Sequence, residues 1–531
     1  MTQDVKRTPP VRCGLLLSLL TLIPASYSGI ADLHAQEPDR IPVHQVRADD
    51  LSPGLESLFD EYRATVRDSM AAHGVPGLSI SVVDRERILW TAGFGVRDLE
   101  TGDPVTPETA FSVQSISKLF TAVAVLRAVE DGILELDAPV TDYLSDFTVN
   151  SRFSERPASR MTVYDLLTHA AGFTHEAPVG NNTDARSPSM EAHVRSIRDT
   201  WLKFPPGTDH AYSNLGVDLA GYILQERSGR PFQDCVDENI LEPLGMTASF
   251  VDTAGQELCQ NCAAGHDENF ASLPEYVPMT ASGGVRVSAE DGGKFLQFLL
   301  RYGETPEGDR ILERSSFDVL YRPTGRFRDL WPHMWNGMGV WVHAPDEGRS
   351  LMHFNGGGFG YIASIRWFPD QGVGALELTN SGDHRQFGDD LTHSVLEGVV
   401  ARGAAPGGRA PDVPTVRSFF TNLPDTTAAT RDTAPGEPTP YRPAWDDYLG
   451  TYEVVYGGGF ELALSADRAG RRAEVLRKDA YLQLRHPGSE EPEPLIEHQP
   501  GLFFGANTGE ALDFRDDPPT WRNIELERVG G

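Results

Sequence analysis

The sequence predicts an α+β protein, in which an antiparallel sheet is flanked by helices with a helical subdomain, followed by a small all-β domain. Three observations lead to this fold class. Two segments near the start read as a β-hairpin, and strand-like segments return only after about residue 360. The long section between them mixes helical patterns with turn-rich loops. Short strand-like runs end the chain, after a segment rich in Pro, Gly, Ala and Thr.

The elements near the start are a helix, a hairpin and a second helix. The first helix, over 54–73, carries its apolar residues on one face. Segment 76–84, "PGLSISVVD", alternates apolar residues, and a charged turn separates it from a second strand over 87–98. The next helix is predicted over 111–132, where a glycine ends it.

The middle and the end of this region complete the predicted sheet. The clearest helices of the middle section are 162–173 and 217–229. Strands over 361–370 and 372–380 then return to the sheet. A final helix over about 386–402 would cover it.

The chain therefore divides into a large domain over 54–402, a linker and a small domain. Residues 403–443 are rich in Pro, Gly, Ala and Thr and lack sustained periodicity, which is typical of a linker. Short strands such as "YLGTYEVVYGGGFELALS" and "AYLQLRHPG" predict a small β domain over 444–531.

The first 35 residues have the pattern of an export signal. Lys6, Arg7 and Arg12 precede a short apolar run, "CGLLLSLLTLI", and "LHAQ" offers a cleavage site after Ala35. The run is too short to span a bilayer comfortably, although an uncleaved anchor remains the alternative. We expect a periplasmic or secreted protein with no membrane span after removal of 1–35.

Composition limits the classes of partner. The 531 residues carry a formal net charge of −31, so the basic surface that nucleic acids require is absent from the sequence. Strong acidity favours solubility and does not specify chemistry. We expect a small-molecule or peptide substrate, with cell-wall fragments among the candidates, and no nucleic-acid partner.

The cysteines allow two interpretations. In an oxidising compartment, Cys235, Cys259 and Cys262 permit one disulfide with one thiol left over. Cys259 and Cys262, with His266 nearby, also suggest zinc, but no fourth ligand is evident. We favour a bridge whose pairing stays open, and we expect neither a metal nor an organic cofactor.

The segment "FSVQSISKLF" places Ser115 three residues before Lys118, one of five lysines and the one with a serine at that spacing. Residues three apart share a helical face, so a hydroxyl and an amine meet there. A serine needs such a partner to act as a nucleophile, and a helix N-terminus favours the negative charge that develops. The alternative is an N-cap serine followed by a solvated lysine.

Two further motifs strengthen the catalytic interpretation. In "AYSNLG", Tyr212 precedes Asn214 by two residues, and a phenol facing the serine suits a proton shuttle. In "MHFNGGGFGY", three glycines enter a strand and allow close approach of a ligand to backbone N–H groups. The alternatives are a packed tyrosine in a turn and a glycine-rich hairpin without a ligand.

Together these motifs resemble the class C β-lactamase / penicillin-binding serine hydrolases, a family with DD-peptidase, D-aminopeptidase and esterase members. The resemblance covers about 54–402 and extends to "ILELDAPVTDYL", "LLTHAAGF" and "LEPLGMTASF". It implies a β-lactamase/DD-peptidase-like antiparallel sheet with a helical subdomain. Segment 444–531 resembles the small β-barrel-like domain that often follows this catalytic domain, and no function is carried over from it.

The resemblance assigns roles to individual residues. Ser115 is the acylated nucleophile, Lys118 its activating partner, Tyr212 the general base, and Asn214 a contact of substrate or lysine. The residues proposed for substrate binding on the glycine-rich strand are His353, Asn355, Gly356 and Gly357.

The strand departs from the family pattern at its basic position. Alignment on the glycines places Phe354 where a Lys or His is usual, and it makes the Gly357 N–H the second oxyanion donor beside that of Ser115. Strand alternation points His353 to the opposite face unless a bulge restores it. Activity against β-lactams becomes doubtful, because that basic residue commonly meets a substrate carboxylate.

These patterns predict an exported serine hydrolase that cleaves an amide or ester through an acyl-enzyme on Ser115. One alternative is a β-lactamase-like carboxylesterase. Another is a non-catalytic penicillin-binding-like envelope module, which the residue at Phe354 supports. The Gly-x-Ser-x-Gly and His-Glu-x-x-His motifs of two other hydrolase classes are absent from the sequence.

Overall fold

The fold is described from a computed structural model of the chain. The described residues are 38–181, 188–252, 259–266, 279–324, 334–343, 349–382, 385–402, 438–454, 472–478, 480–486, 489, 491–515, 518–521 and 524–529. The predicted export signal at 1–35 and most of the predicted linker at 403–443 lie outside these residues.

An eight-stranded antiparallel sheet in the order β1-β3-β2-β11-β10-β9-β8-β7 forms the centre of the large domain. Its strands are β1 (Val43–Arg47), β2 (Gly77–Asp84), β3 (Ile88–Gly95), β7 (Met334–Asn336), β8 (Trp341–His343), β9 (Met352–Gly358), β10 (Tyr361–Phe368) and β11 (Val373–Thr379). The predicted hairpin and the returning strands meet at the middle of the sheet, where Leu78 pairs with Thr379. The edge strand β1 was not predicted, because three of its five residues are exposed and give little alternation.

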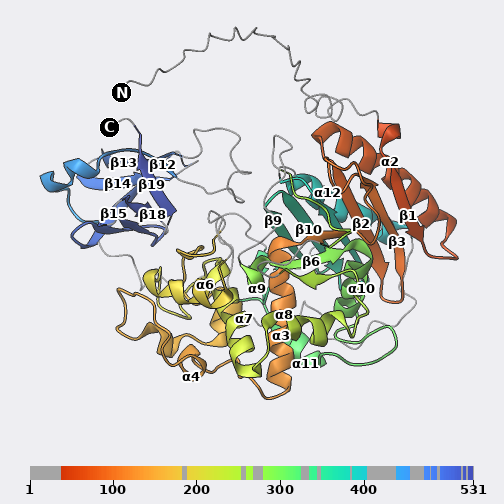
Figure 1. The fold of residues 1–531 in the computed structure, drawn as a ribbon, viewed down its shortest axis with the longest axis horizontal. Coiled ribbons are helices and arrows are strands. Elements are labelled where there is room, and N and C mark those ends of the chain that lie inside the picture. Colours follow the sequence, from red (N-terminus) through yellow and green to blue (C-terminus); the bar gives the residue numbers. More distant parts are fainter. Residues whose placement is uncertain are drawn as a thin grey trace, which may run out of the picture.

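Helices cover both faces of this sheet (Figure 1). On one face lie α2 (Pro53–His73) and α12 (Arg385–Ala401), which share a core with β2 and β3. The other face packs against α10 (Ala289–Leu300). The predicted helix over 54–73 is confirmed by α2, which starts where the Ser52 side chain accepts a hydrogen bond from the Leu55 N–H and ends at Gly74.

The helical subdomain is built around α3 (Ser117–Glu130) and α7 (Asn214–Ser228), whose residues are buried on most sides. Its other α-helices are α4 (Val140–Tyr143), α5 (Val163–Leu167), α6 (Met190–Ser196), α8 (Phe232–Val236), α9 (Thr280–Gly283) and α11 (Arg314–Leu320). The short helical turns outside the barrel are η1 (Pro38–Arg40), η2 (Gln114–Ile116), η3 (Pro157–Arg160), η4 (Ile197–Asp199) and η5 (Asp237–Leu241). No helix in the described ranges combines the length and apolar character needed to cross a bilayer.

The helix predicted over 111–132 begins later than expected. Residues Ala110–Ser112 form β4, an edge strand of a three-stranded sheet, and pair with β6 (Val285–Ser288). A 3₁₀ turn, η2, then leads into α3. The pattern of apolar residues did not reveal this break, because strand, turn and helix are all buried.

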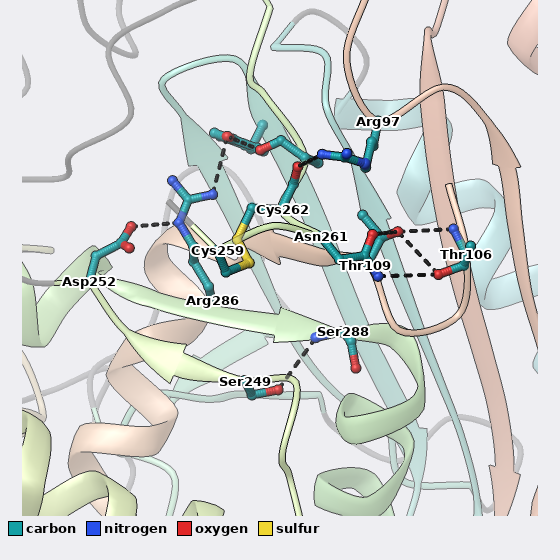
Figure 2. The surroundings of a disulfide bond; sticks show 12 residues. Arg97, Thr106, Thr109, Ser249, Asp252, Cys259, Asn261, Cys262, Arg286 and Ser288 are labelled. Carbon is teal, nitrogen blue, oxygen red and sulfur yellow. Dashed lines mark hydrogen bonds and ion pairs between the residues drawn. A yellow bond between two sulfur atoms is a disulfide. The ribbon is translucent and has the colours of Figure 1, made fainter. Parts of the chain in front are cut away.

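A disulfide joins Cys259 to Cys262 beside this small sheet, in which β6 lies between β4 and β5 (Phe250–Val251) (Figure 2). The guanidinium of Arg97 donates to the carbonyl of Cys262 at 3.1 Å and ties the disulfide segment to the large sheet. Cys235 is buried and free. The favoured interpretation of the cysteines, a bridge with one thiol left over, is the one that the structure shows.

The predicted all-β domain at the C-terminal end is a closed antiparallel barrel. Its strands are β12 (Gly450–Val454), β13 (Arg472–Lys478), β14 (Tyr481–Arg485), β15 (Glu493–Gln499), β16 (Leu502–Gly505), β17 (Ala511–Asp513), β18 (Thr520–Trp521) and β19 (Ile524–Arg528), preceded by the 3₁₀ turn η6 (Pro443–Tyr448). Apolar side chains such as Trp445 and Phe503 fill its interior. In Figure 1 the barrel stands beside the helical subdomain.

Candidate active site

Ser115 lies on η2, between the end of β4 and the start of α3. The preceding residue, Gln114, is buried and has a φ of 47°, in the left-handed region that non-glycine residues rarely adopt. Its side-chain amide donates to the Ser112 hydroxyl at 2.8 Å and helps to hold this conformation. The strained turn places the Ser115 hydroxyl at the head of α3, where helix N–H groups favour negative charge.

Lys118 follows one turn later and its ammonium is buried, with 1 % of the residue exposed. Its Nζ donates to Ser115 Oγ at 3.0 Å and to the carbonyl of Ser282 at 2.9 Å. Asp218 in turn accepts from the N–H and the hydroxyl of Ser282, at 2.9 and 2.8 Å. Because a buried cation is stable only when it is hydrogen-bonded, these contacts fix the amine beside the serine.

Tyr212 approaches the serine from the segment that precedes α7. Its OH donates to Ser115 Oγ at 2.9 Å, and Lys118 Nζ lies 5.1 Å from the centroid of its ring. The hydroxyl, the amine and the phenol predicted from separate parts of the sequence therefore meet at one oxygen. A base, a cation and a nucleophile at hydrogen-bond distance form the arrangement that activates a serine.

Two histidine rings pack against Tyr212, and neither was singled out from the sequence. The His169 ring lies 4.6 Å from the tyrosine ring, and that of His175 stacks on it at 5.5 Å. His169 Nδ1 accepts from the N–H of Ser213 at 3.3 Å. Burial, with smaller contributions from His210 and Lys118, lowers the pKa of His169 well below its usual range. His169 is therefore neutral and serves as part of the wall behind the phenol.

Asn214 is buried at the start of α7, but its side chain faces a carboxylate. Its Nδ2 donates to Glu176 Oε1 at 3.1 Å and contacts the sulfur of Met279 at 3.7 Å. The same Glu176 oxygen lies 2.7 Å from His175 Nδ1. The expected contact of Asn214 with lysine or substrate is not among these bonds, so its substrate-binding role stays a prediction.

The glycine-rich strand β9 runs close to the nucleophile turn. A Cβ atom on Gly356 would lie 2.0 Å from the carbonyl oxygen of Val113, so this position accepts only glycine. Beyond His353 the strand pairs with β10 and not with β8, so its other edge faces η2. Asn355 and Gly357 are partly exposed there. This geometry is consistent with the predicted oxyanion donor at Gly357.

The structure does not bring His353 into the site. Its Nδ1 lies 2.7 Å from Nε2 of His343, and burial, followed by the charge of Arg366, lowers its pKa well below its usual range. Phe354 points the other way, is fully buried and packs on the indole of Trp341 at 4.7 Å. Strand alternation therefore holds without a bulge, and the basic position of the motif carries an aromatic side chain.

The sequence reasoning missed several residues that support the site. His169 lies in "LLTHAAGF", which supplied a signal, because a histidine in an otherwise apolar helical segment is unusual. Ser282 holds the lysine through its backbone carbonyl, which no side-chain pattern reveals. Among the described residues, no group of three or more His, Cys, Asp and Glu side chains has the arrangement of a metal site.

Comparison with known proteins places this geometry in context. A family model described as Beta-lactamase matches residues 62–399. Penicillin-binding protein 4 of Amycolatopsis lactamdurans is 29% identical over 356 residues, which make up 64% of this chain and 88% of that protein. Esterase EstB of Burkholderia gladioli is 27% identical over 405 residues, 66% of this chain and 96% of the esterase.

A solved structure shows a similar fold. The octameric penicillin-binding protein homologue from Pyrococcus abyssi superposes with a TM-score of 0.55 at 22% identity, covering 88% of this chain and 99% of that one. At this identity the likeness concerns the fold alone. The match to the family model, in contrast, spans the region that contains the serine, the lysine and the tyrosine.

Proposed function

Because the chain belongs to the beta-lactamase family of serine hydrolases, we propose that it hydrolyses an amide or ester bond through a covalent acyl-enzyme on Ser115. The observation that carries the proposal is the convergence of two groups on Ser115 Oγ, with Lys118 Nζ at 3.0 Å and the Tyr212 OH at 2.9 Å. This arrangement places a cationic partner and a proton carrier within hydrogen-bond distance of the nucleophile.

The first half of the reaction acylates the serine. Tyr212, whose OH donates to Ser115 Oγ in the structure, first gives up its proton to solvent. Ser115 Oγ then attacks the substrate carbonyl carbon while its own proton passes to the phenolate oxygen of Tyr212. The Lys118 ammonium stabilises the negative charge on this side of the site. The N–H groups of Ser115 and Gly357 would hold the carbonyl oxygen as it becomes negative. Tyr212 then returns the proton to the leaving amine or alcohol, and the bond to the leaving group breaks.

The second half releases the acyl group by the reverse use of the same residues. A water molecule takes the place of the leaving group and gives a proton to Tyr212 as it attacks the ester carbonyl. The tetrahedral intermediate collapses, the Ser115 oxygen recovers its proton, and a carboxylic acid leaves. One water molecule is consumed in this second half, and the proton that it gives to Tyr212 returns to the Ser115 oxygen.

The identity of the strand residue at position 354 bears on the substrate. Phe354 is buried and His353 faces away, so this strand offers no cation at that position for a substrate carboxylate. This favours esters or peptides whose recognition does not depend on that contact over β-lactams. The relatives include both a penicillin-binding protein and an esterase, so a carboxylesterase is the second candidate.

A hydrolysis panel on the mature chain separates these substrate classes. Nitrocefin, p-nitrophenyl esters and D-alanyl peptides are assayed with the wild type and with Ser115→Ala. We expect hydrolysis of an ester or peptide by the wild type and none by the variant. Retention of full activity by Ser115→Ala would refute the acyl-enzyme.

Covalent labelling identifies the nucleophile independently of the natural substrate. A fluorophosphonate, with the adduct mapped by mass spectrometry, should modify Ser115. The matched control is Ser117→Ala, since the Ser117 hydroxyl accepts from the Val285 N–H at 2.9 Å and takes no part in the proposed chemistry. Absence of an adduct at Ser115 in the folded chain would favour a non-catalytic envelope-binding module.

We also propose that the protein is exported to the periplasm or secreted. The proposal is supported by the signal-like pattern at 1–35 and by the disulfide between Cys259 and Cys262, a bond that persists in oxidising compartments. Cell fractionation and N-terminal sequencing test it. We expect a mature N-terminus at Gln36; recovery of the uncleaved chain in the cytoplasm would contradict export.

A further inference from the structure

Glu510, immediately before β17, is buried where the barrel meets the catalytic part of the chain. Its side chain is 6% exposed. One carboxylate oxygen accepts from the Thr174 hydroxyl at 2.8 Å, and the other accepts from Lys203 Nζ at 2.7 Å. Both partners belong to the helical subdomain. A carboxylate this deeply buried is stable only while such bonds are made, so the contact fixes the two parts against each other.

The barrel holds Glu510 in a well-defined turn. The Glu493 carboxylate accepts from the N–H groups of Asn507 and Thr508, at 2.9 and 3.0 Å, and from the Thr508 hydroxyl at 2.7 Å. Thr508 Oγ1 in turn accepts from the Glu510 N–H at 3.2 Å. Hydrogen bonds within the barrel therefore hold the turn that carries Glu510, independently of the contacts of Glu510 with Thr174 and Lys203.

The turn also fits closely against the helical subdomain. Gly509 has a φ of 68°, and a Cβ atom there would lie 3.0 Å from the carbonyl oxygen of Lys203. Nearby, the indole of Trp201 packs edge-on against the rings of His498 and Phe504, at 5.3 and 5.5 Å. The carboxylate thus sits in a packed contact rather than in an isolated surface ion pair.

Hydrogen bonds and ring stacking connect the segment around Thr174 to Tyr212. The Ser213 hydroxyl donates to the carbonyl of Thr174 at 2.6 Å, and the Asn214 N–H donates to that of His175 at 3.3 Å. The His175 ring stacks on Tyr212. Two hydrogen bonds, which meet at Thr174, therefore link Glu510 to Ser213, the residue that follows Tyr212 in the chain.

We propose that Glu510 is a positioning residue for Tyr212, acting from the C-terminal barrel through Thr174; the inference rests on the proposed function of Ser115. Tyr212 precedes α7 and is not held by a helix of its own. Its phenol must stay within hydrogen-bond distance of Ser115 Oγ for proton transfer, and a displacement of about 1 Å is enough to slow catalysis by up to about 10²-fold. The barrel is in this view a part of the catalytic apparatus.

The test compares Glu510→Ala, Glu510→Gln and Thr174→Val in the full mature chain, with hydrolysis of a p-nitrophenyl ester as the assay. We expect Glu510→Ala to lower kcat by about tenfold or more with KM little changed, since proton transfer and not binding is impaired. Thr174→Val should reproduce this effect. Glu510→Gln should recover part of kcat, because its amide oxygen still accepts from the threonine, whereas its NH₂ group cannot accept from Lys203.

The matched control is Glu497→Ala, another glutamate of the barrel. Its side chain is 10% exposed and pairs with Arg442 at 2.9 Å, away from the helical subdomain. This variant should keep the kcat of the wild type. Melting temperatures are measured for all variants, and kinetics are taken where each is folded. The pH profile of kcat should change for Glu510→Ala and not for the control.

Two outcomes would overturn the inference. One is a Glu510→Ala enzyme with the kcat and pH profile of the Glu497→Ala control. The other is a Thr174→Val enzyme with the kcat of the wild type, which would mean that the carboxylate docks the barrel through Lys203 without acting on Tyr212 through Thr174. Failure of the proposed function is recognised separately, by an active Ser115→Ala variant or by a folded wild type that forms no adduct at Ser115.

Discussion

The two sides of the catalytic serine are constructed differently. On the lysine side, Lys118 lies on α3 one turn from Ser115, is 1% exposed, and is held by the Ser282 carbonyl. On the tyrosine side, Tyr212 is partly exposed and depends on neighbouring loops and, through Thr174, on the barrel. The serine and the lysine thus share one helical turn, whereas the tyrosine reaches the serine from a segment far along the chain.

The buried histidines of the two sides also differ, in the direction in which their pKa is shifted. On the lysine side, Nε2 of His193 bonds to Asp218 Oδ2 at 3.2 Å and its Nδ1 to the Val179 carbonyl at 2.7 Å. Burial lowers the pKa of His193, but the hydrogen bond and charge of Asp218 outweigh it and raise the pKa. On the tyrosine side the pKa of His169 is lowered. The pKa of the buried histidine is thus raised on one side of the serine and lowered on the other.

The largest effect is expected from removing the amine. Lys118→Met keeps the length and the apolar stem of the side chain but deletes the cation that contacts Ser115. We expect kcat/KM to fall by about 10³- to 10⁴-fold, the upper range for loss of a group that assists proton transfer. Steady-state kinetics with circular dichroism as a folding control measure it, and a folded variant with near-normal turnover would remove the lysine from the mechanism.

Removing the phenol should have a smaller effect. Tyr212→Phe preserves the ring that packs on His169 and His175 and deletes only the oxygen that bonds to Ser115. We expect a loss in kcat of about 10²-fold, the lower range for such a group, because the neighbouring amine remains. The melting temperature should stay unchanged. A loss equal to that of Lys118→Met would show that the two sides contribute alike.

The opposite pKa shifts predict opposite effects of pH on stability. His169 is neutral in the fold, so its contribution is complete above the unfolded pKa of about 6.5 and is lost as pH falls below that value, with a slope of up to about 1.4 kcal/mol per pH unit. His193 has a raised pKa, so its contribution is complete below about 6.5 and is lost as pH rises through the folded pKa. Urea unfolding of His169→Gln and His193→Gln between pH 5 and pH 8 measures both.

The two variants should therefore diverge from the wild type in different pH ranges. His169→Gln should flatten the loss of stability on the acid side, and His193→Gln should flatten the loss on the alkaline side. Parallel unfolding profiles for the wild type and both variants would contradict the opposite pKa shifts of His169 and His193.

The smallest effect is expected at His353. The sequence predicted this residue near the site, but in the structure it faces away from it. His353→Gln should change KM by less than about twofold, because a side chain that makes no contact with the substrate removes no binding energy. The measurement is KM for an ester with and without a free carboxylate. A large increase confined to the carboxylate-bearing ester would return His353 to substrate recognition.

Prediction from the sequence succeeded where the determinants are local. Ser115 and Lys118 share one helical turn, so their meeting follows from a spacing of three residues. Tyr212 lies far along the chain, and the resemblance to a family, not its spacing, linked it to the serine. The hydrogen-bond partner of Asn214, Glu176, was not foreseen, because the loop that carries it has no periodic pattern.

Other features could not be predicted from the sequence, for physical reasons. The start of the nucleophile helix was misplaced because the left-handed backbone of Gln114 leaves no mark on the apolar pattern. The edge strand β1 is mostly exposed, so burial did not shape its sequence. The contact of Glu510 with Thr174 joins two domains, and an isolated glutamate in a barrel gives no indication of its partner.

The pairing of β2 with β11 at the centre of the sheet has a consequence for biosynthesis. Leu78 and Thr379 are partners, so the middle of the sheet must await the synthesis of almost the entire hydrolase region. Closing so long a loop is slow compared with forming a helix. A nascent chain therefore stays without its central sheet until late, which leaves strand edges exposed to aggregation in the meantime.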